Sequence, residues 1–143
     1  MLQSRPLGTT DVNVSHISFG CASIANLYVS VSDKAAHDVL SYAWQRGIRY
    51  FDTAPHYGRG LSETRLGRFL QTVPKNEVTL SSKVGRVLTP GKQRSEADGF
   101  VSPSPTTCGM TILVPELWRV SKGALSGWAS ITLTSFMCTT LEN

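Results

Sequence analysis

Three short apolar runs predict buried strands at residues 14–19, 48–52 and 78–83, because each lies next to a glycine or a polar turn. Two longer stretches between these runs carry apolar residues at helical spacing. The order strand, helix, strand, helix, strand predicts parallel strands joined by crossover helices. The pattern therefore indicates an α/β fold in the first part of the chain.

Both predicted helices carry start and stop signals. Ser32 followed by Asp33 is typical of a helix N-terminus, because a serine hydroxyl caps free N–H groups and a carboxylate favours the positive end of the helix dipole. Gly47 supplies the stop, and the second helix runs from Ser62–Glu63 to near Pro74. The apolar positions at helical spacing are Ala36, Val39, Leu40, Ala43 and Trp44 in the first helix and Leu66, Phe69 and Leu70 in the second.

The composition changes in the second half of the chain. All aspartates and histidines lie at or before Asp98, whereas serine and threonine supply eleven of the 38 residues from 106 to 143. Residues 86–105 are rich in glycine, proline and serine, which predicts a connecting loop. We therefore predict two parts, residues 1–105 and 106–143.

Composition and charge exclude several classes. The chain has 143 residues, of which 41% are hydrophobic, and a net charge of +4, as expected of an ordinary globular protein. Lysine and arginine are scattered, which favours a solvated surface over a nucleic-acid partner, and no apolar run approaches a membrane span. The cysteines are odd in number and widely spaced, which predicts a reducing, cytoplasmic compartment: Cys21, Cys108 and Cys138.

Polar residues lie at the ends of the predicted strands. Gly20–Cys21 follows the first strand, Asp52 ends the second and Lys83 ends the third. Parallel strands end at one rim, which is where (β/α)8 barrels carry their active sites, and Tyr57 can fold back over it. A free tyrosine, with a pKa of about 10, donates a proton poorly, but a neighbouring ammonium held by a carboxylate makes a phenol more acidic. The set predicts a proton donor for a carbonyl oxygen as hydride reaches the carbon.

Each of these residues alone has a simpler interpretation. Asp52 could cap a strand end, Tyr57 could pack in the core, and Lys83 could be a solvated amine; only their combination favours chemistry. Cys21 is best interpreted as a small buried hydrophobe. No metal site is predicted, since the spacing of the candidate ligands fits no standard zinc site: His16, Cys21 and His56.

One segment resembles the signature of the aldo-keto reductases. It consists of residues 49–58, with the sequence Arg-Tyr-Phe-Asp-Thr-Ala-Pro-His-Tyr-Gly, together with Ser62–Glu63. Pro6–Thr10, Ser18–Cys21 and Ser81–Gly85 match the same family in the right order, so that the resemblance covers residues 5 to about 105. The chain is most similar to the bacterial aldose (fucose-type) 1-dehydrogenases and pyridoxal 4-dehydrogenases of that family. A loop like Asp98-Gly99-Phe100-Val101 also occurs there.

This resemblance implies a TIM barrel, of which the chain holds the first three βα units followed by an irregular C-terminal tail. It implies NADP or NAD as the cofactor and a small carbonyl compound or sugar as the substrate. Asp52, Tyr57 and Lys83 would then be three of four catalytic residues, with Tyr57 as the general acid/base, Lys83 as its pKa partner and Asp52 as the orienting group. Gly20 and Cys21 would lie near the nicotinamide end of the cofactor.

The sequence departs from the family pattern in two ways. The fourth catalytic residue of the family is a histidine at the end of strand four, but no histidine follows His56, and the nucleotide-binding loops near strands seven and eight are missing. Three strands cannot close a barrel and leave both sheet edges unpaired. We therefore expect a truncated, inactive oxidoreductase; the alternative is a non-enzymatic fragment that binds a partner, or a copy of itself, through an open sheet edge.

The second part is interpreted as an out-of-frame translation. Reread one base upstream, residues 126–131 can encode Gln-Arg-Leu-Gly-Leu-Asp, and residues 132–140 can encode His-Ile-Asp-Val-Leu-His-Val-His-Asp, which is the family pattern around strand four. The slip would fall between Pro105 and Cys108, and the missing histidine would be encoded at Thr139. The alternative is a genuine divergent segment. The first interpretation predicts no strand-four site and little order after residue 105.

Overall fold

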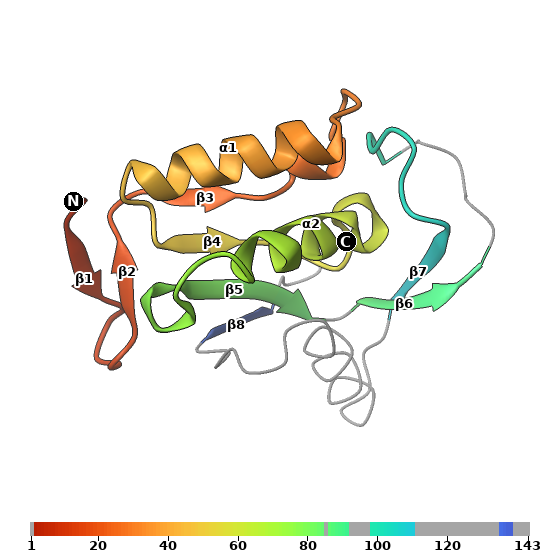
Figure 1. Cartoon of the computed structure of the whole chain (residues 1–143). Helices are drawn as coiled ribbons and strands as arrows, with labels where there is room; N and C mark the ends of the chain where they lie inside the picture. The colour runs from red at the N-terminus through yellow and green to blue at the C-terminus, as the bar shows by residue number, and fades with distance from the viewer. Residues whose placement is uncertain (1, 85, 92–97, 111–134, 139–143) are drawn as a thin grey trace.

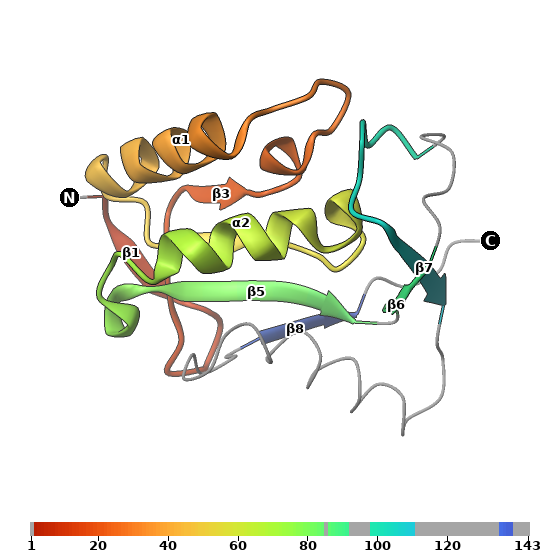
Figure 2. The same cartoon turned by 45° about the vertical axis from the view of Figure 1, so that its right-hand side comes forward.

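The computed structural model describes residues 2–84, 86–91, 98–110 and 135–138. Its centre is a parallel sheet of four strands in the order β3 (Ser18–Gly20), β4 (Tyr50–Asp52), β5 (Thr79–Val84) and β8 (Ser135–Cys138). Two helices, α1 (Asp33–Gln45) and α2 (Leu61–Leu70), lie side by side over the sheet (Figures 1 and 2). The predicted α/β arrangement of parallel strands with crossover helices is confirmed.

Strand register brings the strand ends to one level. Gly20 pairs with Asp52, and Asp52 pairs with Ser81, so β3 and β4 end level and β5 continues to Lys83 and Val84. In parallel strands, paired residues occupy the same height along the sheet. The loops that follow these strands therefore lie at the same end of the sheet, the end at which the strands terminate, as predicted.

The predicted strand at residues 14–19 is two strands instead of one. β2 (Asn13–Ser15) pairs antiparallel with β1 (Ser4–Pro6), and only the later part of the run enters the parallel sheet as β3. The break has a local cause, because the Ser15 hydroxyl donates to the carbonyl of Ile17 at 2.8 Å. Such short side-chain bonds compete with strand pairing and turn the chain.

The helices form as their sequence signals predict. The Ser32 hydroxyl accepts a hydrogen bond from the Ala35 N–H at 3.1 Å and so caps α1, and Gly47 follows the helix with a positive φ of 92°. Val39 is exposed, in contrast to the other apolar positions predicted for this helix: Ala36, Leu40, Ala43 and Trp44. Both helices bury one apolar face against the sheet: Ala36, Leu40 and Ala43 from α1, and Leu66, Phe69 and Leu70 from α2.

Aromatic residues fill the space between helices and sheet. Phe51, at the centre of β4, is fully buried and contacts Phe69 of α2 and Phe19 of β3, with ring centroids 6.0 and 6.1 Å apart. Trp44 packs edge-on against Phe69 at 6.4 Å, so both serve as core residues, as predicted. This core joins β4 to β3 and to α2.

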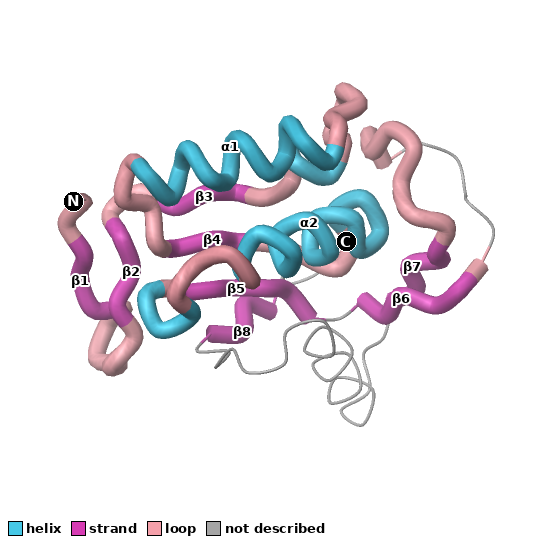
Figure 3. Tube along the Cα trace, viewed as in Figure 1, coloured by secondary structure: helices cyan, strands magenta, loops and turns pink. Residues whose placement is uncertain are grey.

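The region after residue 85 contains more strands than the sequence predicts. β6 (Arg86–Pro90) lies in the predicted loop and pairs antiparallel with β7 (Thr106–Met110), while β8 pairs parallel with β5 from Ser81–Ser135 to Val84–Cys138 (Figure 3). The expectation that three strands leave both sheet edges unpaired is therefore wrong at the β5 edge, where residues 135–138 add a fourth strand. The expected absence of a strand-four site stays a prediction, because Thr139 lies outside the described residues. The edge of β5 offers free N–H and C=O groups, and β8 satisfies them.

Parts of the tail remain outside the description. The predicted out-of-frame histidine position, Thr139, and residues 111–134 lie outside the described residues, and the boundary at residue 105 stays a prediction. Among the residues that are described, no helix is long and apolar enough to cross a membrane.

Candidate active site

A lysine and a carboxylate meet where β4 and β5 end. The Lys83 ammonium lies 2.7 Å from Oδ2 of Asp52 and also donates to the carbonyl of Thr53 at 3.1 Å. The two side chains are only 19% and 26% exposed, so water screens their interaction less than it would at the surface. The convergence predicted from the strand ends is confirmed for this pair.

Tyr57 completes the group from the loop after β4. It opens the short 3-10 turn η2 (Tyr57–Gly60), and the Lys83 ammonium lies 4.9 Å from the centroid of its ring. The Lys83 ammonium thus contacts both the carboxylate and the phenol, although β4 and β5 are separated by a whole helix in sequence. The structure brings the three predicted catalytic residues together.

Two effects oppose each other at Lys83. Burial alone lowers the pKa of Lys83, but hydrogen bonds to Asp52 and to Tyr57, with the charges of both groups, outweigh it and raise the pKa of Lys83 above its ordinary value. Lys83 is therefore fully charged at neutral pH, held between an acid and a phenol.

Ser81 is a site residue that the sequence analysis missed. Its hydroxyl donates to Oδ1 of Asp52 at 2.6 Å and also contacts the Tyr50 hydroxyl at 3.0 Å. One oxygen of Asp52 is therefore bound by Ser81 and the other by Lys83, which fixes the orientation of the carboxylate. The sequence did contain a signal for Ser81, since it lies two residues before Lys83 in one strand and side chains two residues apart lie on the same face of a strand.

Gly20 ends β3, and Cys21 follows it at the same end of the sheet. Gly20 is exposed, and a Cβ added there would meet nothing within 4 Å. Cys21 is wholly buried, and its N–H donates to the Asp52 carbonyl at 2.8 Å. Burial strongly raises the pKa of the Cys21 thiol; the charge of Asp52 adds to this and that of Lys83 opposes it. Cys21 is thus a core residue, as predicted from its side chain, and not a reactive thiol.

His56 and Phe100 border Tyr57. Phe100 is 3% exposed, and its ring lies 5.6 Å from that of His56 and 6.1 Å from that of Tyr57. Burial lowers the pKa of His56; the charges of Arg86 and Arg59 lower it further and that of Asp98 raises it. Within the described ranges no group of three His, Cys, Asp or Glu side chains could hold a metal ion.

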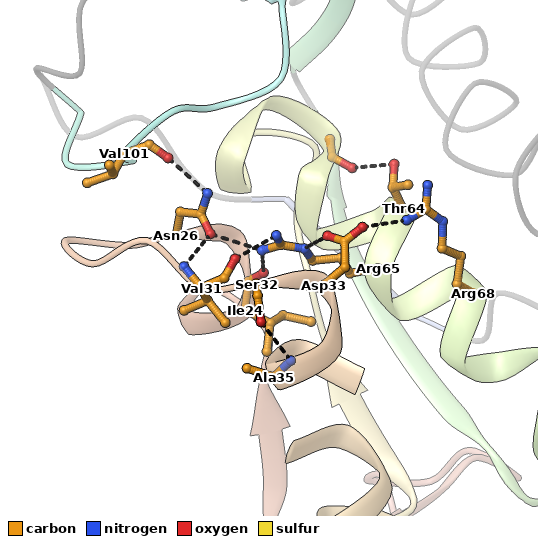
Figure 4. Close-up of polar contacts among 11 residues, drawn as sticks. Ile24, Asn26, Val31, Ser32, Asp33, Ala35, Thr64, Arg65, Arg68 and Val101 are labelled. Carbon is orange, nitrogen blue, oxygen red and sulfur yellow. Dashed lines mark hydrogen bonds and ion pairs between the residues drawn. The ribbon is translucent and has the colours of Figure 1, made fainter. Parts of the chain in front are cut away.

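Arg65 anchors the loop between β3 and α1 (Figure 4). Its side chain is only 9% exposed, and its guanidinium donates to the carbonyls of Ile24 and Val31 at 2.6 and 2.8 Å and to the amide oxygen of Asn26 at 2.9 Å. It also pairs with Asp33 at 2.8 Å, and the hydrogen bonds of Asp33 to Arg65 and Arg68, with the charges of both, lower the pKa of Asp33 against the opposing effect of burial. One side chain of α2 therefore fixes the backbone that follows the site strand β3.

The family model described as "Aldo/keto reductase family" matches residues 16–105, and the chain belongs to this family. D-threo-aldose 1-dehydrogenase from Pseudomonas sp is 54% identical over 78 residues, which are 54% of this chain and 24% of that protein. Pyridoxal 4-dehydrogenase from Microbacterium luteolum is 42% identical over 87 residues, which are 61% of this chain and 25% of that protein. The chain thus spans about a quarter of the length of these relatives.

Solved structures share the fold. An aldo-keto reductase from Bacillus halodurans superposes with a TM-score of 0.75 at 23% identity, over 96% of this chain and 40% of that one. Its barrel carries parallel βα units like those built here by β3, β4 and β5. The predicted family and the predicted barrel-type fold are confirmed.

Proposed function

We propose that Asp52, Tyr57 and Lys83 are the proton-transfer group of an NAD(P)-dependent carbonyl oxidoreductase. The contact that supports this most directly is that of Lys83, whose ammonium meets the Asp52 carboxylate and the Tyr57 ring together. A positive charge beside a phenol stabilises the phenolate that remains when the phenol gives up its proton.

In the reducing direction, the Tyr57 hydroxyl gives its proton to the carbonyl oxygen of the substrate while the carbonyl carbon receives a hydride. The C=O π bond breaks, a C–H and an O–H bond form, and Lys83 balances the negative charge on the Tyr57 oxygen. Asp52 holds Lys83 in place, and Ser81 holds Asp52. In the oxidising direction Tyr57 removes the hydroxyl proton, so an aldose gives a lactone and an alcohol gives an aldehyde.

A nicotinamide cofactor, NADP or NAD, supplies or accepts the hydride in this proposal. Gly20 fits the ring end of such a cofactor, since it is exposed beside Asp52 with open space at its Cα. The phosphates fit less well in the part of the chain that is described, because Asp33 and Glu63 place a carboxylate in the first turn of α1 and of α2. We infer that the 143-residue protein alone does not bind the nucleotide tightly and is inactive. A cytoplasmic place of action fits this chemistry.

A second candidate function is association through a sheet edge. Among the described strands, β3 pairs with β4 alone, so its other edge presents N–H and C=O groups to any further strand. A partner chain or a second copy that adds a strand there would bind without turnover. Concentration-dependent assembly in sedimentation velocity, with no effect of NADPH, would favour this candidate.

The experiment uses the 143-residue protein and a chimera. In the chimera, residues 1–105 replace the matching part of D-threo-aldose 1-dehydrogenase from Pseudomonas sp, which provides the rest of the barrel. We expect no change of NADPH fluorescence with the 143-residue protein, but NAD(P)-dependent aldose oxidation by the chimera. Tyr57→Phe should reduce turnover of the chimera by roughly 10²–10⁴-fold and leave cofactor affinity nearly unchanged, since it deletes the transferred proton and no nucleotide contact.

Two outcomes would contradict the proposal. Tight NADPH binding by the 143-residue protein would show that it holds a nucleotide site of its own. Full turnover by the Tyr57→Phe chimera would exclude Tyr57 as the proton donor. Tyr42→Phe is the matched control, because Tyr42 is an exposed tyrosine of α1 whose ring contacts Arg46 and not, among the contacts described, a residue of the site.

A further inference from the structure

The turn that carries Tyr57 has an unusual backbone. Gly58, Arg59 and Gly60 have positive φ angles of 58°, 53° and 93°, and for Arg59 such an angle carries a steric cost. A Cβ on Gly58 would come within 2.7 Å of the Ala25 carbonyl oxygen, so the turn lies tight against the loop after β3. Strained conformations persist where surrounding structure over-determines them.

Residues 98–104, here called the strap, hold the other side of this turn. The Ser104 N–H donates to the Gly58 carbonyl at 3.0 Å, and Asp98 pairs with Arg59 at 3.4 Å. Phe100 then packs against the rings of His56 and Tyr57. The strap, drawn in teal beside the orange loop in Figures 1 and 2, thus contacts the turn at each of its residues from 56 to 59.

The strap is itself fixed to the loop after β3. Asn26 exchanges two hydrogen bonds with Val101, one through its carbonyl and one through its side-chain amide, each 3.0 Å long. The Tyr28 N–H donates to the Gly99 carbonyl at 2.7 Å, and Leu27 forms a bridge with Phe100. Asn26 is in turn held by Arg65, so the strap, the loop and α2 form one connected support (Figure 4).

We propose that Phe100 is a positioning residue for proton transfer, whose ring keeps the Tyr57 phenol in contact with Lys83. The inference rests on the proposed function of Tyr57 and adds a support that lies outside the strands and helices of the site. Phe100 does not touch the reacting atoms, because its ring is buried behind those of His56 and Tyr57. A smaller apolar side chain at this position lets the phenol move away from the ammonium.

The test follows Lys83 by NMR in the intact 143-residue chain with 13C-labelled lysine, the Lys83 signal being assigned by its loss in Lys83→Met. In wild type, the titration midpoint of Lys83 lies above that of an ordinary lysine. Tyr57→Phe is expected to lower this midpoint, because it removes one of the hydrogen-bond partners of Lys83. Phe100→Leu is expected to lower the midpoint in the same direction and by a comparable amount. Phe100→Tyr keeps the ring and is expected to keep the wild-type midpoint.

Phe69→Leu is the matched control, because Phe69 is a buried core ring that contacts Trp44, Phe51 and His37. It should lower stability and leave the Lys83 midpoint unchanged. If Phe100→Leu does not fold, Asp98→Asn, which weakens the pairing of the strap with Arg59, should move the midpoint in the same direction by less. An unchanged midpoint in Phe100→Leu, or an equal shift in Phe69→Leu, would overturn the role of Phe100. An unchanged midpoint in Tyr57→Phe would overturn the Tyr57–Lys83 pairing of the proposed function as well.

Discussion

Glu63 is a carboxyl whose removal should stabilise the protein in a pH-dependent way. It lies in the first turn of α2, and its Oε1 accepts a hydrogen bond from the Ser82 hydroxyl at 3.0 Å. Burial raises the pKa of Glu63 from 4.5 to about 7, against the opposing effect of the Ser82 hydrogen bond. The folded state therefore binds this proton more tightly than the unfolded state does.

The sign and size of the effect follow from linkage. A raised pKa means that the stabilisation from protonated Glu63 is complete below pH 4.5 and is lost as the pH rises through about 7. At about 1.4 kcal/mol per pH unit, the interval between 4.5 and about 7 corresponds to about 3.5 kcal/mol of unfolding free energy. Glu63→Gln keeps an acceptor for Ser82 and cannot ionise, so it should gain most of this stability at pH 8 and little at pH 4.5.

The assay is urea unfolding, followed by circular dichroism, of wild type and Glu63→Gln at several pH values from 4.5 to 8. Only the difference between the two proteins is interpreted, because His56 titrates in the same window with the opposite sign: burial lowers its pKa, so its contribution is lost as the pH falls. Glu77→Gln is the control, since Glu77 has the same charge on a half-exposed side chain paired with Arg49. If the difference between wild type and Glu63→Gln changes by less than about 1 kcal/mol across this range, the folded-state pKa of Glu63 lies close to its ordinary value and burial does not raise it.

Three further predictions use other parts of the molecule. Arg65→Met should lower the unfolding free energy by about 2–4 kcal/mol, since it leaves buried carbonyls without donors, whereas Arg68→Met, at a 63% exposed side chain, should cost less than about 1 kcal/mol; equal losses would contradict the anchoring role of Arg65. Gly58→Ala should cost more in urea unfolding than Gly8→Ala, because both have φ near 60° but only Gly58 has an atom within 3 Å of an added Cβ; equal costs would show that backbone strain alone decides. The out-of-frame interpretation predicts an inserted or deleted base in the DNA around codons 105–108, and correcting it should restore a frame that encodes Val-His-Asp at the end of strand four. The same unshifted frame in independent isolates would exclude this interpretation.

Local signals in the sequence were sufficient for much of the fold. The cap at Ser32 and the apolar faces of both helices follow from side-chain spacing and hydrogen bonding within a few residues, and the parallel order follows from the alternation of strands and helices. Asp52 and Lys83 could be placed at one rim for the same reason. Tyr57 was added from its place on the short loop after Asp52, and the family motif then supported all three residues together.

Long-range contacts were not predictable in this way. The pairing of β8 with β5 joins residues 135–138 to residues 81–84 through backbone groups, which every residue except proline carries in full, so no side-chain pattern marks it. Arg65 likewise binds mostly main-chain carbonyls of a distant loop. The split of the run at residues 14–19 depended on one serine hydroxyl, a competition that apolar periodicity does not detect.

The burial of Cys21 makes it a natural reporter of motion beneath the site. Its thiol is out of reach of reagents and is held in the protonated, unreactive form while the strand ends, the loop after β3 and α2 stay together. Labelling of Cys21, in a variant with serine at Cys108 and Cys138, therefore requires an opening event and has a rate set by how often that event occurs. The labelling rate of Cys21 therefore measures how often the residues beneath the candidate site open, and a ligand that closes the site should lower that rate.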